Sequence, residues 1–305
     1  MKTVIAIDIG GTKTHGALID EQGNMLKNHK IATNPSLGAA ALLQSLFALI
    51  DELKAGEEIV GIGIASAGRI DIEQGSVFYA TDNIPGWTGV ALRTILKNAY
   101  HIPVFVDDDV NAAGPGEEWL GAARDHESYV LIALGTGIGG SIKVNGRLLR
   151  GAHWSAGELG HMILYPHGRH CNCGLDGCFE QYCSGTALVK RYQELSKKCI
   201  QDGYALFEQI KAKDPIAIQV LHEFVEDLSI AMISIANMFD PEIILIGGGL
   251  SDTKEVWWDE LIQCVSSSAL STIFTPKIIP AKLGNHAGLY GAAYLVFDYL
   301  KTFHE

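Results

Sequence analysis

Short apolar runs alternate along this chain with longer segments in which apolar residues recur every three or four positions. In the first half they predict strands at 3–9, 13–20, 24–32, 59–65 and 103–107, helices at 37–55, 89–99 and 110–121, and a polar hairpin-like stretch at 69–88. The short runs are typical of buried strands, and the recurring positions are typical of helices that pack on a sheet. This order predicts a mixed sheet with flanking helices.

The same pattern begins again near residue 129. It predicts strands at 129–135, 141–149, 242–247 and 276–280, a glycine-rich turn at 136–140, and helices at 184–196, 204–211, 214–238, 255–270 and 287–301. Because both halves begin with strand, glycine turn and strand, we expect an α/β protein of two similar lobes with a cleft between them. The predicted lobes are 1–120 together with about 288–305, and 121–287. The last helix is assigned to the first lobe on topology alone.

Composition narrows the class of protein. The chain has 305 residues, of which 48% are hydrophobic, and it has no uninterrupted apolar run of eighteen residues, so we expect no membrane span. A net charge of −12 argues against nonspecific nucleic-acid binding, but not against phosphate substrates. The first apolar run is short and contains Asp8, which is unlike a signal peptide. We therefore expect a cytoplasmic protein.

The segment HMILYPHGRHCNCGLDGCFE at 161–180 carries the most specific chemistry. His161, Cys171, Cys173 and Cys178 supply one imidazole and three thiolates, a full tetrahedral ligand set for zinc. Disulfides and simple burial are the alternatives. We favour metal, because clustered cysteines in a reducing compartment bind metal or act in catalysis more often than they pair. The scattered cysteines are expected to be core residues: Cys183, Cys199 and Cys264.

Three glycine turns follow apolar strands. They contain Asp8, Gly10, Gly11, Thr12 and Lys13; then Gly135, Thr136 and Gly137; then Gly247, Gly248 and Gly249. Glycines let the backbone approach a phosphate closely, the Thr12 hydroxyl adds a donor, and Asp8 has the chemistry to hold a hydrated Mg²⁺. A single turn of this kind is more often only a hairpin. Three in two lobes favour phosphate binding, although both GxxxxGK[ST] and a first-strand GxGxxG are absent from the sequence.

Acidic residues gather where a strand is followed by a helix, at Asp107, Asp108 and Asp109. Capping of the helix explains one or two of them. Three adjacent carboxylates repel one another, and that crowding favours a task such as general base toward a hydroxyl. Glu158 and His161 are three residues apart, so one helical turn would place them on the same face. Trp87, in a polar turn, is expected to be a core residue.

Together these motifs resemble the ROK family (repressors, uncharacterised reading frames and sugar kinases) of the actin-like ATPase superfamily. The matching stretches are DIGGTKT at 8–14, VDDDVNAA at 106–113, LGTGIGG at 134–140, GELGHM at 157–162, CNCGLDGCFE at 171–180 and IGGGLS at 246–251. They span nearly the whole chain. The resemblance implies a two-lobed actin-like (ribonuclease H-like) fold with an interlobe cleft.

The resemblance also implies residue roles. Asp109 would be the catalytic base, taking the proton of a sugar's primary hydroxyl as that oxygen attacks the γ-phosphate of ATP. The implied sugar contacts are Gly68, Arg69, Thr81, Asn83, Asp108, Glu158, His161 and Glu180. The three glycine turns would bind ATP with Mg²⁺, and the His161–cysteine set would hold a structural zinc. Members of the family often form dimers, so a homodimer is expected.

The expected reaction makes a hexose 6-phosphate. Glucose is the first candidate, because CFEQYCSGTALV at 178–189 looks most like glucokinase members; N-acetylmannosamine kinases and fructokinases share most motifs, and SAGRID with Thr81 fits the former. Asp108 stands where the family usually has Asn, and Asp107 where it has Glu. A carboxylate only accepts hydrogen bonds, whereas an amide also donates, so this departure bears on sugar preference.

Two other readings of the resemblance remain. One is a sugar-sensing protein related to the ROK repressors, which carry an N-terminal helix-turn-helix domain. We expect no such domain here, because the first phosphate motif begins at Asp8. The other is a catalytically silent relative.

Overall fold

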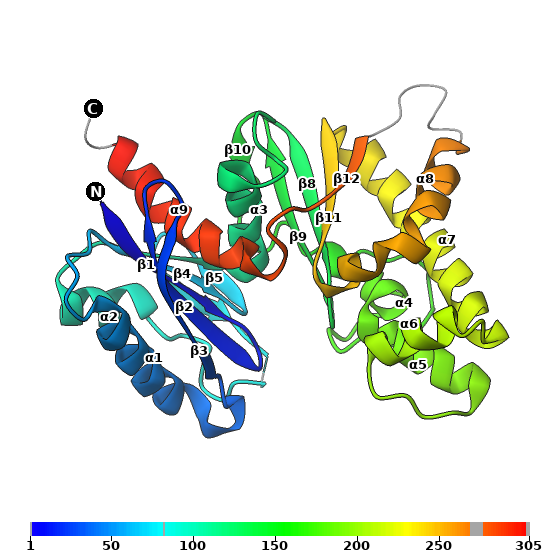
Figure 1. Ribbon diagram of the computed structural model, residues 1–305, viewed down its shortest axis with the longest axis horizontal. Coiled ribbons are helices and arrows are strands. Elements are labelled where there is room, and N and C mark those ends of the chain that lie inside the picture. Colours follow the sequence, from blue (N-terminus) through cyan, green and yellow to red (C-terminus); the bar gives the residue numbers. More distant parts are fainter. Residues whose placement is uncertain (1, 82, 269–276, 303–305) are drawn as a thin grey trace. The chain divides into compact units, whose positions relative to one another are not determined.

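The computed structural model describes residues 2–81, 83–268 and 277–302 and divides into two compact units, which are described separately (Figure 1). The first unit comprises Met1–Asp125, Leu148–Ala156 and Asn285–Glu305, and the second comprises His126–Arg147 and Gly157–Gly284. The segment Leu148–Ala156 therefore belongs to the first unit, although the predicted boundary put it in the second lobe. Parts of four predicted segments lie outside the described residues: 82, 269–270, 276 and 303–305.

The first unit is built on a five-stranded sheet of order β3-β2-β1-β4-β7. Its strands are β1 (Thr3–Ile9), β2 (Lys13–Asp20), β3 (Met25–Ala32), β4 (Ile62–Ser66) and β7 (Val104–Asp108), with a small hairpin of β5 (Arg69–Asp71) and β6 (Ser76–Tyr79). Its helices are η1 (Pro35–Leu37), α1 (Gly38–Lys54), α2 (Leu92–Tyr100), α3 (Asp109–Leu120), η5 (Gly284–His286) and α9 (Ala287–Thr302). β1 pairs antiparallel with β2 and parallel with β4.

Successive side chains of β1 point to opposite faces of this sheet, and different helices cover the two faces. Ile5, Ile7 and Ile9 belong to the core cluster that includes the buried face of α1. Val4 and Ala6 belong to the opposite cluster, which includes α9 and Ala112 of α3. Figure 1 shows α1 and α9 on opposite sides of this sheet. Asp8 follows in the Val4 and Ala6 series, so its side chain lies on the α3 and α9 face.

Glycines allow α9 to lie directly on its neighbours. A Cβ on Gly291 of α9 would collide with the backbone of Ala112 in α3, and one on Gly116 of α3 would collide with the backbone of Ala287. A Cβ on Gly63 of β4 would meet Ala292 in the same way. Such close approach requires residues without side chains. The last helix is thereby fixed against the strand–helix junction of β7 and α3.

The second unit repeats the order of the first, with a sheet β10-β9-β8-β11-β12. Its strands are β8 (Tyr129–Leu134), β9 (Ile138–Val144), β10 (Arg147–Leu148), β11 (Ile243–Gly247) and β12 (Lys277–Pro280). Its helices are η2 (Leu159–His161), α4 (Glu180–Cys183), α5 (Gly185–Ser196), α6 (Gly203–Lys211), α7 (Pro215–Phe239), η3 (Gly249–Val256) and α8 (Trp258–Ser266). Apolar residues of β8 and β11 form one core with α5, α6, α7 and α8.

Two predicted boundaries in the second unit are wrong. The turn expected at 136–140 is shorter, because Gly139 and Gly140 pair with Ala133 and Ile132 as part of β9. The helix expected at 255–270 begins as the 3-10 helix η3 and breaks near Trp257. Among the scattered cysteines, Cys183 is buried as expected, but Cys264 is only partly buried and Cys199 is exposed.

One helical stretch of the described residues, Pro35–Lys54, is long and apolar enough to cross a membrane by length and composition. Within this unit, α1 instead turns Leu42, Leu46, Leu49 and Leu53 into the core under the first sheet. Five apolar residues of α1 are buried by this packing.

Candidate active site and metal centre

In the first unit, the turn between β1 and β2 exposes a glycine that the fold does not require. The Gly10 amide donates to the Lys13 carbonyl at 3.0 Å, and the Thr33 hydroxyl donates to the Gly10 carbonyl at 2.8 Å. Gly11, Thr12 and Lys13 are exposed. Gly11 has no positive φ, and a Cβ there would meet nothing within 4 Å. A close-lying ligand, rather than the fold, is therefore a reason for glycine at this position.

The three acidic residues at the end of β7 have different environments and hydrogen-bond partners. Asp107 is buried and bonds Nη1 of Arg150 at 2.6 Å. Asp108 caps α3, its Oδ1 accepting the amides of Val110 at 3.1 Å and Asn111 at 2.9 Å. Asp109 is the first residue of α3 and is partly buried. The capping role of Asp108 needs only one oxygen, so the family's usual Asn and the Asp found here both satisfy it.

Asp8 and Asp109 form an acidic pair on the α3 and α9 face. Burial, and secondly the charge of Asp109, raise the pKa of Asp8 from 3.8 to about 7. Gly288 at the start of α9 leaves room here: a Cβ would lie 3.1 Å from Asp8 Oδ2 and 3.3 Å from the Asp109 carbonyl oxygen. Carboxylates crowded in this way attract a divalent cation or a proton. Their chemistry fits the hydrated Mg²⁺ expected beside Asp8.

Apart from Asp108, the residues expected to contact sugar in this unit lie at the ends of the β5–β6 hairpin. Gly68 has φ +99° and closes against the Tyr79 carbonyl, and Arg69 lies over the Tyr79 ring at 5.6 Å. Thr81 and Asn83 are exposed in the turn that follows. Trp87 is fully buried and donates to Ser66, as expected of a core residue.

Arg93 of α2 holds this hairpin, a role that was not predicted from the sequence. Its guanidinium donates to three backbone carbonyls: Glu73 at 2.6 Å, Ile72 at 2.8 Å and Val104 at 3.0 Å. The first two belong to the turn of the hairpin and the third to β7. One planar side chain with five donors therefore ties the hairpin to the sheet. An arginine on an amphipathic helix resembles any surface cation, which is why the sequence alone did not single it out.

In the second unit, the turns after β8 and β11 also contain glycines that the fold does not require. Gly135 and Gly249 have no positive φ, and the nearest atoms to an added Cβ lie 3.8 and 4.0 Å away. Gly248, by contrast, has φ +81° and lies against the backbone of Leu134, so the fold itself demands glycine there. Gly137 lies against the Glu180 carboxylate, which accepts the Ile138 amide at 2.9 Å. Glu180 thereby links this turn to the segment that carries the cysteines.

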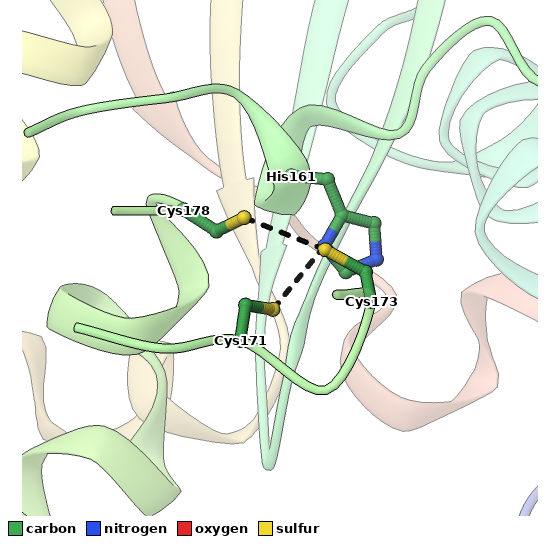
Figure 2. Close-up of side chains that lie close together, drawn as sticks. All are labelled: His161, Cys171, Cys173 and Cys178. Atoms are coloured by element: carbon green, nitrogen blue, oxygen red, sulfur yellow. Dashed lines mark hydrogen bonds between the residues drawn. The ribbon is translucent and has the colours of Figure 1, made fainter. Parts of the chain in front are cut away.

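Residues 161–180, called the cysteine loop below, bring four metal-binding side chains together. Donor atoms of His161, Cys171, Cys173 and Cys178 all lie within 4.8 Å of one another. Figure 2 shows them converging from separate stretches of the loop, with the Cys173 and Cys178 sulfurs 3.6 Å apart and Cys171 Sγ 3.7 Å from His161 Nδ1. A tetrahedron with zinc–sulfur bonds of about 2.3 Å has edges of about 3.7 Å. The donor set and its spacing therefore fit zinc.

The orientation of His161 divides its two nitrogens between the cluster and a carboxylate. Nδ1 faces Cys171, while Nε2 lies 3.9 Å from Glu158 Oε2. Glu158 precedes the 3-10 turn η2 and His161 is its last residue, so the turn sets them on one side as their spacing predicted. A metal bound at Nδ1 would leave Nε2–H as a donor beside Glu158.

The thiols of the cluster do not titrate alike. Burial, together with the contact with Cys173, raises the pKa of Cys178 to about 12. Burial also acts to raise the pKa of Cys173, but hydrogen bonds from the Leu175 amide and from Cys171 and Cys178 together lower it. Because a metal binds thiolates, metal binding must release the proton of Cys178.

Known proteins resemble this chain over nearly its whole length. The ROK family profile matches residues 4–299. The chain is 33% identical over 311 residues to a glucokinase of Streptomyces coelicolor, covering 96% of this chain and 97% of that one. A crystal structure of a ROK hexokinase from Thermus thermophilus superposes with a TM-score of 0.87 at 32% identity, covering 98% and 99% of the two chains. The xylose repressor of Bacillus subtilis is 29% identical, covering 97% of this chain and 77% of its own.

Two units built on sheets of the same order, with a glycine turn after the first strand of each, define the two-lobed actin-like ATPase fold shared with the ROK kinase structures. Within that class, this chain belongs to the ROK family.

Proposed function

We propose that this protein transfers the γ-phosphoryl group of ATP to the 6-hydroxyl of a hexose, with glucose as its substrate. That it is a sugar kinase follows from its family and from the glucokinase and hexokinase relatives. The observation that carries the finer proposal is the start of α3. There Asp109 stands at the end of a parallel strand, next to its capping neighbour Asp108 and close enough to Asp8 to raise the pKa of that carboxyl.

In the proposed mechanism, Asp109 accepts the proton of the sugar's 6-hydroxyl as that oxygen attacks the γ-phosphorus. Helix α3 begins at Asp109, so the carboxylate is fixed in direction by the helix start and by the bond from the Val110 amide at 2.9 Å. The backbone at Gly11, Gly135 and Gly249 would bind the nucleotide. Mg²⁺ held near Asp8 would neutralise phosphate charge, and a bound cation would keep Asp8 ionised despite its raised pKa.

Each unit carries polar groups suited to sugar hydroxyls. The hairpin of the first unit offers Gly68, Arg69, Thr81 and Asn83 beside Asp108; the second unit offers Glu158, His161 and Glu180. Zinc would hold His161 at Nδ1 and keep Nε2–H available as a donor. Fixed donors and acceptors of this kind discriminate strongly between sugars, because a mismatch leaves a polar group unpaired.

Two narrower alternatives share this chemistry: N-acetylmannosamine kinase and fructokinase. A third possibility, a sugar-sensing protein without turnover, draws its support from the xylose repressor among the relatives. All four predict sugar binding, so only turnover separates the kinases from the sensor.

We propose a cytoplasmic homodimer as the working form, in keeping with the dimers common in the family. The described surface of α7 exposes Ile230 and Met238, two turns apart. Sedimentation at micromolar concentration is the test. A single species of twice the 32.9 kDa chain mass is the expected result, and a persistent monomer contradicts the dimer.

The deciding experiment measures ADP release with ATP, Mg²⁺ and a panel of glucose, N-acetylmannosamine, N-acetylglucosamine, mannose, fructose and allose. We expect release with glucose. Asp109→Asn should keep sugar binding and lose turnover by about a hundredfold or more, as for loss of a general base. Asp108→Asn, which restores the family's residue and keeps the helix cap, is the matched control and should remain active. Release from no sugar by a folded, zinc-loaded protein would favour the sensing alternative.

A further inference from the structure

A buried charged cluster lies beside the cysteine loop and has no part in the proposed chemistry. Arg191 of α5 and Asp227 of α7 are both buried, and Arg191 Nη2 bonds Asp227 Oδ2 at 2.6 Å. The other oxygen of Asp227 accepts the Tyr165 hydroxyl at 2.7 Å. Arg191 also bonds Glu223 at 3.2 Å. A carboxylate bound on both oxygens, and held by a buried arginine, is a fixed and strong acceptor.

Tyr165 belongs to the cysteine loop, and its backbone holds the strand that carries a metal ligand. The amides of Leu164 and Tyr165 both donate to the Gly177 carbonyl, at 2.8 and 3.2 Å. Ile163 forms a β-bridge with Cys178. Gly177, with φ +83°, closes directly on the Tyr165 carbonyl, so no side chain fits there. Movement of Tyr165 therefore moves the segment that presents Cys178.

A second contact holds the same loop. The Tyr182 hydroxyl accepts the Arg169 amide at 2.8 Å, and the Gly177 amide donates to the Arg169 carbonyl at 2.8 Å. The rings of Tyr165 and Tyr182 lie 4.8 Å apart, and the Arg191 guanidinium lies 5.8 Å from the Tyr182 ring. Arg191 thus contacts both tyrosine supports of the loop, one through Asp227 and one directly.

We propose that Tyr165, Asp227 and Arg191 form a second, metal-independent anchor of the cysteine loop, and that Tyr165 is a positioning residue for the groups that bind sugar. The metal would hold one side of the loop, where His161 and the cysteines lie. The tyrosine anchor would hold the other side against α5 and α7. The positioning role of Tyr165 rests on the proposed sugar contacts of His161 and Glu180. The anchoring of the loop does not depend on them.

The anchor is expected to work throughout the ordinary pH range. Burial and the bond to Asp227 raise the pKa of Tyr165, so its hydroxyl remains a donor. The carboxylate cannot turn away to water without breaking its 2.6 Å bond to the buried Arg191, which is costly. The loop should therefore keep part of its order when the metal is removed.

The test removes a single oxygen. Tyr165→Phe keeps the ring and deletes the donor to Asp227; Tyr192→Phe is the matched control, because Tyr192 also bonds a carboxylate of this unit, Asp214 at 3.3 Å, but lies outside the loop. We expect Tyr165→Phe to speed zinc release to a chromophoric chelator about tenfold, equivalent to about 1.4 kcal/mol. Its sugar KM should rise by about tenfold with little change in kcat or in the KM for ATP.

Hydrogen exchange provides a readout that needs neither zinc nor sugar. In metal-stripped protein, the amides of Leu164 and Gly177 should lose protection in Tyr165→Phe and keep it in Tyr192→Phe. Asp227→Asn should reproduce the Tyr165→Phe pattern more strongly. Unchanged exchange in both Tyr165→Phe and Asp227→Asn would overturn the anchor. Faster exchange and zinc release with an unchanged sugar KM would overturn only the positioning role, and absence of kinase activity in every variant would bear on the proposed function alone.

Discussion

The two units hold their irregular segments by different means, although their sheets have the same order. In the first unit, the β5–β6 hairpin is tied down by one protein cation, Arg93, which donates to three carbonyls. In the second, the longer cysteine loop converges on four metal-binding side chains and is also held by the bond from the Tyr165 hydroxyl to buried Asp227. A short hairpin is within reach of one arginine, whereas a loop of twenty residues needs cross-links at two places. Agents that weaken one segment should leave the other intact.

Metal removal gives the largest expected effect and acts on the second unit alone. Stripping zinc should abolish sugar affinity before ATP affinity, because His161 loses its orientation while the glycine turns remain. Calorimetry with each ligand, before and after chelation, measures this difference. Cys199→Ser, at an exposed cysteine outside the cluster, is the control and should retain zinc. Equal loss of sugar and ATP affinity would refute a role on the sugar side.

The second effect is confined to the first unit and depends on pH. Asp8 has a pKa of about 7 in the fold and about 3.8 when unfolded, so between these values the folded chain keeps a proton that the unfolded chain has lost. The free energy of unfolding should therefore fall as pH rises from about 4 to about 7, by at most about 4 kcal/mol. Asp8→Asn should remove this slope and stabilise the metal-free protein most above pH 7.

Denaturant midpoints at several pH values measure the slope. Asp71→Asn, at a partly buried carboxyl in the hairpin, is a control that should keep it. A slope of the same size in Asp8→Asn would show that another group is responsible. Saturating ATP and Mg²⁺ should flatten the slope of the original protein if the cation binds ionised Asp8.

Arg93→Met should loosen the hairpin that a chelator leaves intact. We expect a loss of about 3 kcal/mol of stability, since three carbonyls lose a charged donor, together with a raised sugar KM. Lys97→Met on the exposed side of the same helix is the control and should have little effect. Zinc content should stay at one ion per chain; zinc loss in Arg93→Met would show that the two segments are coupled.

The smallest effect compares equivalent turns of the two units. Gly11→Ala and Gly135→Ala should leave the melting temperature unchanged and raise the KM for ATP, because the fold has space for a Cβ and a nucleotide lying close to the backbone would not. Gly248→Ala should instead lower the melting temperature, since its positive φ and the Leu134 backbone exclude a side chain. Differential scanning and ATP titration separate the two outcomes. Destabilisation by Gly11→Ala would mean that the fold needs this glycine.

Local pattern was enough to predict most of the elements, because the apolar runs of β1, β4, β8 and β11 are buried on both faces and therefore conspicuous. The acidic cap of α3 and the His161–cysteine set could also be predicted, since the residues of each lie close together in sequence. The turn prediction was wrong at Gly139 and Gly140, because glycines usually mark turns, yet these two pair in β9. Pairing with β8 places these two glycines in a strand.

Long-range contacts could not be read from the sequence. Asp107 and Arg150 are paired across the first unit, and nothing near either residue points to the other. Asp227 does carry a signal in the sequence, because it is an acidic residue on the apolar face of α7, close to Phe224 and Leu228. An acid on a buried face requires a partner. The sequence does not say that the partners are Arg191 and Tyr165.

The packing of α9 has a consequence for how the protein is made. Asp8 lies on β1, and the helix that covers it, α9, with Gly288 beside its carboxylate and Gly291 against α3, is synthesised long after that strand. Until that helix emerges, the nascent first unit must expose the apolar face of Val4, Ala6 and Ala112. The acidic pair can reach its final environment only after translation of α9. This unit is therefore expected to complete its folding only after α9 has been synthesised, and to need protection from aggregation until then.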